Sequence, residues 1–471
     1  MSEPNNQDTH GTATHDPDRP AALLEFMTSG WEPREQDLPD EHPAAPYRAL
    51  RRAALAHRFA GERLVIPTGG YKTRSNDTEY RFRPATEFAH LVGSHEPDAV
   101  LVVESGRSVL YQAPVMDRST PAFFTDRVHG ELWVGPRPSL ETTQALLGLE
   151  TRPLEELDKL SGPARVLRGH DVRVEALFDT VEEADVELAM FLSELRLVKD
   201  AHEVRELQKA VDATVLGFED VVRQLGQAKA TSERWVEGVF NLRARVEGND
   251  VGYGSICAAG AHACVLHWTD NDGAVRDGEL ILLDMGVEGR ELYTADVTRT
   301  LPVNGTFTPR QREVYQLVYQ AQEASIAACR PGADFLAPHR AAMQVLAHGL
   351  VQLGVLQDAE AALAEDAQLY RRYTLHGVSH MLGLDVHDCA QARQQTYRKG
   401  TLEVGYVLTV EPGLYFQPDD LTVPADLRGI GVRIEDDIVI TEDGCRNLSA
   451  ALPRDPDGVE AWMAGLLPGA Q

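Results

Sequence analysis

Residues 279–305, ELILLDMGVEGRELYTADVTRTLPVNG, decide the fold, and Asp284 and Asp296 are the two acids around which the chain is organised. Residues 280–283 form a compact apolar run, a polar break with a glycine follows at 288–291, and a run rich in β-formers comes after it. Two such runs around a short polar break are typical of a β-hairpin. We therefore predict a hairpin with one of the two aspartates on each strand.

Asp284 and Asp296 lie at equal distances in sequence on either side of Arg290, inside the expected turn. In a simple antiparallel register they would face each other, with Cβ atoms roughly 4.5–5.5 Å apart. Two carboxylates so placed repel each other, and one must hold a proton unless a cation binds. The pair therefore indicates a metal site. The alternative is two solvated acids on a surface hairpin, because exposed aspartate is the norm.

The composition is that of a globular protein with more than one domain. The chain has 471 residues, of which 43% are hydrophobic and 25% charged, which is ample for a substantial core. Its net charge of −28 argues against sequence-independent nucleic-acid binding, which needs a basic surface, and against adhesion to anionic membranes. We expect neither a nucleic-acid nor a membrane partner.

The chain carries no signal that would direct it out of the cytoplasm. No run approaches the length of a membrane helix, and the first thirty residues are acidic and polar, without a signal-peptide pattern. The five cysteines are odd in number and show no CxxC pair, which disfavours a disulfide framework or a zinc–thiolate site. We expect a cytoplasmic protein with reduced thiols.

We predict a tail and two domains. Residues 1–45 are acidic and poor in apolar residues, so we expect a mostly disordered N-terminal tail, with an apolar island at 23–27 and Trp31 that docks on the body. Residues 46–197 read as an α/β domain with a helix at 48–59, a polar loop at 73–84, and strands at 64–67, 99–103 and 131–134. Residues 198–471 form the second domain, whose boundary we place near Leu197 and Val198.

Two helix starts are clear in the second domain. Asp200 and Glu203 have the spacing of a capping box for a helix that begins at Ala201. Thr308 and Gln311 have the same spacing around a proline at the first helical position. We predict a helix after each of these two N-caps.

Three further clusters carry chemistry. His376, His380 and His387 lie within twelve residues interleaved with glycines, although each alone is more often a structural histidine. Glu411 ends an apolar strand at 407–410, just before a Pro-Gly turn, and a buried strand end needs a partner for such a carboxylate. A glutamate there can equally face water. The histidine group and this glutamate extend the candidate metal site.

Arg433 and Glu435 form the third cluster, in the strand predicted at 431–440. Alternation places both on one face, where the arginine can hold the carboxylate ionised, or where the two form a structural pair. Together the clusters supply two Asp, two Glu and one His, enough for two metal ions with bridging carboxylates. Such oxygen-rich ligation favours Mn²⁺ or Co²⁺ over a structural, thiolate-bound Zn²⁺.

These stretches resemble a known family. LLDMGVEGRELYTADVTRTLPVNG, HGVSHMLGLDVHD, LTVEPGLYF and GIGVRIEDDIVIT are similar to the metal-binding motifs of the "pita-bread" dinuclear metallopeptidases, and within them of the Xaa-Pro aminopeptidases. TRSNDTEYRFRP and HLVGSHEPDAVLVV resemble the N-terminal domain of aminopeptidase P. The likeness runs from residue 46 to about 450. It implies an α/β (α+β) fold, with an aminopeptidase P N-terminal domain at 46–197 and a pita-bread catalytic domain at 198–471.

The resemblance also implies the metal ligands. Asp284 would bind one metal ion, Asp296 and Glu435 would bridge both, and His380 and Glu411 would complete the other. It implies two Mn²⁺ ions per subunit, with Co²⁺ or Zn²⁺ as alternatives. A hydroxide that bridges the two ions would attack the scissile carbonyl.

Other residues take supporting roles through the same resemblance. His267 and His387 would hold substrate and stabilise the tetrahedral intermediate, and Glu411 would shuttle a proton. His376, Arg433 and Arg398 would contact the substrate. The candidate catalytic residues are His267, His387 and Glu411.

The implied activity is release of the N-terminal residue from peptides with proline at the second position. Prolidase, which cleaves Xaa-Pro dipeptides, is the nearest alternative because it shares all five ligands. A non-catalytic or creatinase-like relative is a further alternative, which the intact ligand set disfavours. The resemblance also implies a homodimer or homotetramer.

Overall fold

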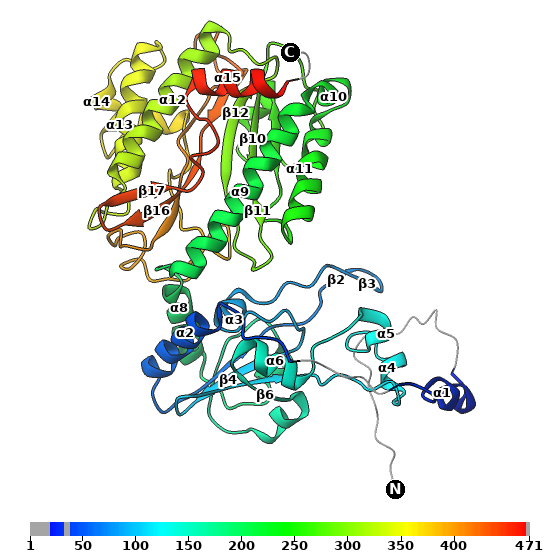
Figure 1. Cartoon of the computed structure of the whole chain (residues 1–471). Helices are drawn as coiled ribbons and strands as arrows, with labels where there is room; N and C mark the ends of the chain where they lie inside the picture. The colour runs from blue at the N-terminus through cyan, green and yellow to red at the C-terminus, as the bar shows by residue number, and fades with distance from the viewer. Residues whose placement is uncertain (1–18, 33–37, 468–471) are drawn as a thin grey trace. The chain divides into compact units, whose positions relative to one another are not determined.

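The computed structural model describes residues 19–32 and 38–467, and it divides into two compact units. The first is Met1–Leu192 and the second Ser193–Gln471. The division falls within helix α8 (Glu182–Leu195), slightly before the boundary that the sequence suggests near Leu197 and Val198. Figure 1 shows both units, coloured from blue at the N-terminus to red at the C-terminus. In the described residues no helix combines the length and the apolarity that a membrane crossing needs.

The first unit is built on a five-stranded mixed sheet in the order β6-β5-β4-β1-β7. The predicted helix at 48–59 and the strands at 64–67 and 99–103 are confirmed as α2, β1 and β4. The apolar sides of these strands pack into a core with residues such as Val65, Val102 and Phe178. The elements of the sheet and its helices are β1 (Arg63–Pro67), β4 (Val100–Glu104), β5 (Arg107–Gln112), β6 (Glu150–Pro153), β7 (Arg165–Val166), α2 (Ala45–Arg58), α3 (Thr86–Leu91), α6 (Leu140–Leu147), α7 (Val172–Glu175) and η1 (Leu154–Lys159).

Two predictions in this unit are wrong. Residues 131–134 form helix α5 (Glu131–Val134) rather than a strand, and Trp133 donates its indole N–H to the carbonyl of Phe124 at 2.8 Å, in helix α4 (Ala122–Thr125). Four apolar-rich residues are too few for periodicity to separate the two states. Residues predicted as a polar loop contain the short hairpin of β2 (Thr73–Ser75) and β3 (Thr78–Glu79).

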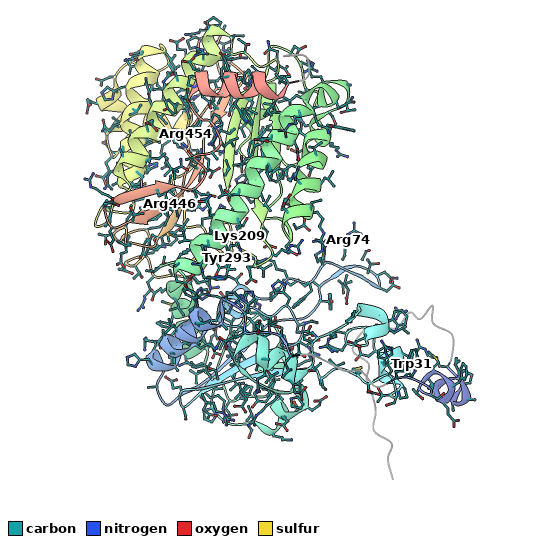
Figure 2. The ribbon with its side chains drawn as sticks, in the orientation of Figure 1. Trp31, Arg74, Lys209, Tyr293, Arg446 and Arg454 are labelled. Atoms are coloured by element: carbon teal, nitrogen blue, oxygen red, sulfur yellow. The ribbon has the colours of Figure 1, made fainter. Side chains whose placement is uncertain are left out.

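Within the apolar island, Trp31 contacts the body of the first unit. Residues 21–27 form helix α1 (Ala21–Met27), which has no buried residue. The ring of Trp31, labelled in Figure 2, has its centroid 6.2 Å from that of Phe124. The Arg118 guanidinium lies over the Trp31 ring at 5.1 Å. The prediction of disorder for residues 1–45 concerns in large part residues 1–18 and 33–37, which lie outside the described residues.

The second unit holds its strands between two pairs of helices. Figure 1 shows α9 and α11 on one side of β10 and β12, and α12 and α13 on the other. Its helices are α9 (Ala201–Arg223), α10 (Leu225–Ala230), α11 (Glu233–Glu247), α12 (Pro309–Ala328), α13 (Ala337–Gln352), α14 (Ala359–Leu363) and α15 (Pro456–Leu466), with 3₁₀ turns η2 (Gly260–Cys264) and η3 (Leu369–Arg372). Its strands are β8 (Asp250–Val251), β9 (Ile256–Ala259), β10 (Leu280–Met285), β11 (Val287–Glu288), β12 (Val297–Pro302), β13 (Val407–Val410), β14 (Gly413–Tyr415), β15 (Gly431–Arg433), β16 (Asp436–Thr441) and β17 (Gly444–Asn447).

Both predicted helix starts are confirmed. The Asp200 carboxylate accepts the backbone N–H groups of His202 and Glu203, and the Glu203 side chain accepts the N–H of Asp200. Thr308 and Gln311 make the same reciprocal box at the start of α12. These contacts satisfy N–H groups that have no partner within the helix.

The central hairpin forms, but its register differs from the predicted one. β10 and β12 pair antiparallel with Asp284 opposite Thr298, so Asp284 and Asp296 are diagonal neighbours on one face rather than a direct pair. The loop is centred on Glu291 because Glu288 still pairs with Thr294 across it. The predicted single strand at 431–440 is likewise two strands, since β15 ends at Arg433 and β16 begins at Asp436.

Candidate metal centre

One cavity of about 710 Å³ in the second unit collects every residue that the sequence predicts for the site. Its walls come from the ends of β10, β12 and β13, the gap between β15 and β16, and the loops before and between them. Among its lining residues are His267, Asp284, Asp296, His376, His380, His387, Arg398, Glu411, Arg433 and Glu435.

The two hairpin aspartates share one partner at the base of the cavity. The Tyr253 hydroxyl lies 2.7 Å from Oδ1 of Asp284 and 2.6 Å from Oδ1 of Asp296. A phenol has a single hydrogen, so it can serve only one of these oxygens at a time. Both aspartates are buried, at 9% and 5% exposure. The remaining carboxylate oxygens therefore need donors or a cation from elsewhere.

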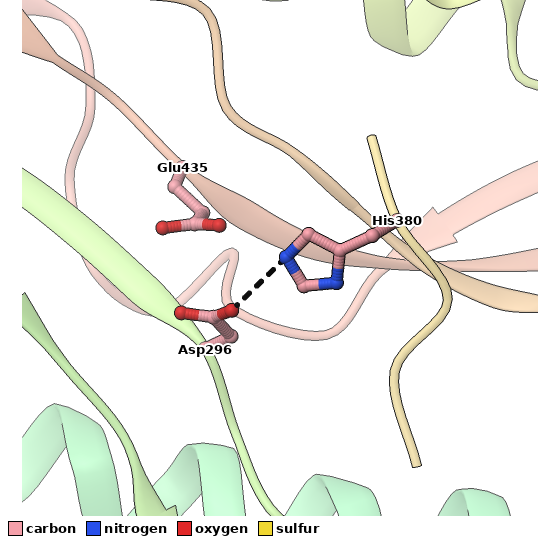
Figure 3. A group of neighbouring side chains, drawn as sticks. All are labelled: Asp296, His380 and Glu435. Atoms are coloured by element: carbon pink, nitrogen blue, oxygen red, sulfur yellow. Dashed lines mark ion pairs between the residues drawn. The ribbon is translucent and has the colours of Figure 1, made fainter. Parts of the chain in front are cut away.

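The His380 imidazole lies close to two of the acids, Asp296 and Glu411. Its Nε2 is 3.3 Å from Oδ2 of Asp296 and 3.6 Å from Oε1 of Glu411. Figure 3 shows that His380 and Glu435 both point toward Asp296. Among the described residues, Asp296, His380 and Glu435 each offer a ligand atom, and these atoms all lie within 4.8 Å of one another.

We call Asp284, Asp296, Glu411 and Glu435 the acid cluster. Burial, more than any single neighbour, raises the pKa of Asp284, raises that of Glu411 to about 8, and raises that of Glu435 well above its usual range. Without a cation the Glu411 carboxyl group would hold a proton at neutral pH. Burial lowers the pKa of His380, but Asp296 and Glu411 outweigh it and raise it to about 9. The chemistry of this donor set fits hard or borderline divalent ions.

Arg433 and its neighbours fix the acids in place. The guanidinium of Arg433 donates to Oδ2 of Asp284 at 2.6 Å, to Oγ1 of Thr298 at 3.2 Å and to the hydroxyl of Tyr415 at 2.9 Å. Thr298 in turn donates its hydroxyl to Oε2 of Glu435 at 2.6 Å. The sequence pairs Arg433 with Glu435, whereas the structure pairs its guanidinium with Asp284. The Thr298 hydroxyl links Arg433 to Glu435, because it accepts from the guanidinium and donates to the carboxyl group.

His376 is held as a neutral ring. Its Nδ1 lies 2.9 Å from the carbonyl of Gly377, so Nδ1 carries the hydrogen, and Nε2 accepts from the Tyr415 hydroxyl at 2.8 Å. Burial first and Arg433 second lower the pKa of His376 to about 4. This imidazole is therefore uncharged at neutral pH, and both of its nitrogens already have hydrogen-bond partners.

His267, His387 and Arg398 line the same cavity. The His387 ring stands nearly perpendicular to the His380 ring, with centroids 4.4 Å apart. His387 therefore touches the edge of the candidate metal centre. His267 comes from the loop that follows η2, and Arg398 from the segment before β13.

Three side chains of the site escaped prediction from the sequence. The Tyr253 hydroxyl contacts the two aspartates, and the Tyr415 hydroxyl contacts Arg433 and His376. The Thr298 hydroxyl contacts Glu435. The position of Thr298, two residues after Asp296 on the same face of β12, is the only local signal among them. The tyrosines carry no comparable signal because their partners are distant in sequence.

Comparison with known proteins places both units in one family. The model for "Metallopeptidase family M24" matches residues 205–442, and that for "Aminopeptidase P, N-terminal domain" matches residues 48–166. Xaa-Pro aminopeptidase 1 of Streptomyces coelicolor is 57% identical over 94% of this chain and 92% of that protein. Xaa-Pro aminopeptidase of Escherichia coli is 33% identical over 88% of this chain and 97% of that protein.

Solved structures agree. Aminopeptidase P from E. coli with the inhibitor Pro-Leu superposes with a TM-score of 0.79 at 32% identity, over 90% of this chain and 99% of that one. Proline aminopeptidase P II from Yersinia pestis gives 0.76 at 33% identity, over 89% and 99%.

Fold and site together define a hydrolase of the metallopeptidase class, with an N-terminal domain and a pita-bread catalytic domain. The family and the acid cluster imply that it uses a divalent metal. The chain belongs to metallopeptidase family M24, in its Xaa-Pro aminopeptidase branch.

Proposed function

We propose that this protein releases the N-terminal residue from peptides whose second residue is proline. The observation that carries the proposal is the single cavity that holds five carboxyl groups, four imidazoles and two guanidinium groups, contributed by segments far apart in the chain. The names of relatives that align over nearly the whole chain support the substrate class.

We propose Asp284, Asp296, His380, Glu411 and Glu435 as the ligands of two Mn²⁺ ions, with Co²⁺ or Zn²⁺ as alternatives. The four carboxyl groups of the acid cluster are close to the His380 imidazole, whose pKa is raised, and to the Arg433 guanidinium. These two positive groups are too few to balance four carboxylates. When bound, such ions would lower the pKa of a water molecule and polarise the scissile carbonyl. The open side of the cavity leaves room for a peptide.

The chain's own residues would orient the substrate and move protons. We propose that His267 and His387 donate hydrogen bonds to the scissile carbonyl oxygen as negative charge develops there. Glu411, at the cavity wall, would take a proton and return it to the leaving amine of proline. His376 would contact the peptide as an uncharged ring, and Arg398 would contact the peptide as well. Arg433 would hold Asp284 in place and line the cavity beside the substrate.

Three further assignments belong to this proposal. Residues 46–197 form the N-terminal domain and 198–471 the catalytic domain, after an acidic tail at 1–45. The protein is a homodimer or homotetramer. It works in the cytoplasm, which suits its five cysteines, all of which are free thiols.

The experiment compares a Gly-Pro-containing tripeptide with the Gly-Pro dipeptide, each after chelator treatment and again after addition of Mn²⁺. Mn²⁺-restored cleavage before proline in the tripeptide, with little turnover of the dipeptide, is the expected result. Preference for the dipeptide would make the protein a prolidase. No turnover of either peptide, with metal bound, would contradict the substrate assignment and leave the metal centre intact.

A further inference from the structure

Outside the acid cluster, Glu233 is a buried acid with an unusual number of donors. Its side chain is 0% exposed, and it is the first residue of α11. Oε1 accepts the backbone N–H of Ala259 at 2.7 Å and lies 2.9 Å from Nδ1 of His262. Oε2 accepts the indole N–H of Trp268 at 2.8 Å and the backbone N–H of Gly273 at 2.7 Å. Each carboxylate oxygen therefore has two partners, which fills its acceptor capacity.

These partners belong to one loop. Residues 260–273 leave β9, form η2 and return beside the start of α11, where the N–H of Glu233 donates to the carbonyl of Gly273 at 2.9 Å. The rings of His262 and Trp268 stack with centroids 3.9 Å apart and an interplanar angle of 24°. Glu233 thus ties the beginning and the end of the loop to the same helix.

Gly273 and Asn271 also hold the end of this loop in place. A Cβ at Gly273 would lie 2.5 Å from Nδ1 of His262 and 2.8 Å from Oε1 of Glu233, so only glycine permits this approach. Asn271 adopts a φ of 49° and is fully buried. Its amide accepts the N–H of Cys257 and donates to the carbonyl of Ser255, each at 2.9 Å. The end of the loop is therefore joined both to α11 and to the strand beside β10.

The middle of this loop enters the metal cavity. Leu266, His267 and Thr269 line the cavity on either side of Trp268, whose indole points to Glu233 instead. In the part of the chain that the structure describes, no group hydrogen-bonds to the His267 imidazole. The loop that carries this ring is held at both ends by Glu233. Between these ends, Cys264 donates its thiol to the carbonyl of Phe416 at 3.3 Å, and its backbone carbonyl accepts the side-chain N–H of Gln417 at 2.8 Å.

We infer that Glu233 is a positioning residue for His267. By clamping residues 260–273 it holds the imidazole at the depth where it can meet a substrate carbonyl. This inference rests on the proposed function, in which His267 contacts the substrate. A misplacement of about 1 Å can cost a reaction about a hundredfold, so a clamp on the loop bears directly on rate.

The test is a double-mutant cycle on cleavage of the Gly-Pro tripeptide. Glu233→Gln keeps the shape of the side chain but turns an NH₂ group toward donors that need an acceptor. We expect it to lower kcat about tenfold, with unchanged affinity for Mn²⁺ by calorimetry. In a His267→Ala background the same change should have less than about a twofold effect, because effects on one coupled unit are not additive. Glu247→Gln, at the other end of α11, is the matched control and should leave kcat unchanged.

Each outcome decides a different question. An equal loss from Glu233→Gln in both backgrounds would mean that Glu233 is structural only and would overturn the inference. A normal rate for His267→Ala, with an active wild type, would reject the role of His267. If Glu233→Gln fails to fold, Trp268→Phe replaces it in the cycle, because it removes one of the four donors and keeps the carboxylate.

A second measurement covers a wild type that cleaves neither peptide, a result that would reject the proposed function. Hydrogen exchange of the backbone amides is compared between wild type, Glu233→Gln and Glu247→Gln. Faster exchange confined to residues 260–273 in Glu233→Gln supports the clamp. Exchange that is unchanged there, or raised across the whole unit, overturns it.

Discussion

The acid cluster and the ion pair of Asp388 are two groups of buried charges in the same unit. Neighbouring cations determine the direction of the pKa shift of Asp388, whereas burial determines it for three acids of the cluster. Asp388 is 2% exposed, and its Oδ1 and Oδ2 lie 2.9 Å from Nε of Arg196 and 3.4 Å from Nζ of Lys199. Burial raises the pKa of Asp388, but Arg196 and Lys199 outweigh burial and lower it. In the acid cluster burial is the largest influence on Asp284, Glu411 and Glu435, and it raises the pKa of each.

The difference separates a structural ion pair from a site that needs a ligand. The negative charge of Asp388 is matched by two cations of the chain itself, whereas four carboxyl groups face one guanidinium and one imidazole. Burial alone therefore does not identify a metal site. The informative quantity is the charge that the surrounding residues leave uncompensated.

The largest expected effect tests the need for the ligand. Glu435→Gln should lower kcat/KM on the Gly-Pro tripeptide about ten-thousandfold, or about 5.4 kcal/mol, because an amide cannot supply the negative charge that a bridging ligand provides. The urea stability of the metal-free protein should change by less than about 1 kcal/mol, since the carboxyl group and the amide have nearly the same shape. Retention of a tenth of the activity would remove Glu435 from the ligand set.

The matched substitution in the Asp388 ion pair should lower the free energy of unfolding. Asp388→Asn removes the carboxylate that Arg196 and Lys199 face, and removing one partner of a buried ion pair costs about 3–5 kcal/mol. Urea unfolding of the metal-free variant, followed by circular dichroism, measures this loss beside Glu435→Gln. Equal stability of the two variants would contradict the contrast between the two sets.

Added cation should stabilise only a protein with an intact acid cluster. With Mn²⁺ at a hundred times its Kd, wild type should gain about 2.7 kcal/mol, seen as a rise in Tm by calorimetry. Asp388→Asn should keep this gain, and Glu435→Gln should lose most of it at the same Mn²⁺ concentration. A similar rise in all three proteins would indicate binding at some other place on the acidic surface.

The smallest effect is the dependence of stability on acid pH. Because the pKa of Asp388 is lowered in the folded state, its contribution is complete above the unfolded value of about 3.9 and is lost as the pH falls toward the folded value. The slope from one such group is at most about 1.4 kcal/mol per pH unit. Below pH 4, metal-free wild type should therefore lose stability faster than Asp388→Asn. Parallel curves from urea unfolding at pH 4 and pH 3 would show that Asp388 is not ionised in the folded protein.

Much of the fold and of the site could be predicted because the relevant signals are local. The capping boxes at Asp200 and Thr308 are sequence patterns with a fixed hydrogen-bond geometry, and both form as expected. The short segment at 131–134 gave no such signal and was predicted wrongly, since four residues allow a helix or a strand equally well.

The hairpin register shows where local reasoning stops. Symmetry about Arg290 predicts a direct Asp284–Asp296 pair, yet Asp284 pairs with Thr298. Leu292 adopts a φ of 69° inside the loop and is buried at 1% exposure, which lengthens the connection. The rest of the unit buries that side chain, and the symmetry of the hairpin sequence does not contain this burial.

The sequence by itself determined the family, the two-domain fold class and the identity of the acids and histidines that meet in one cavity. Residue type and spacing carry that information, because chemistry restricts which side chains can serve at a metal centre. Only the tertiary structure decided that the Tyr253 hydroxyl lies within hydrogen-bond distance of both aspartates, that Arg433 holds Asp284, and that Glu233 contacts the loop of His267. These contacts join residues that are distant along the chain. Only folding brings their atoms to hydrogen-bond distance, and burial then shifts the pKa values of the acids of the site.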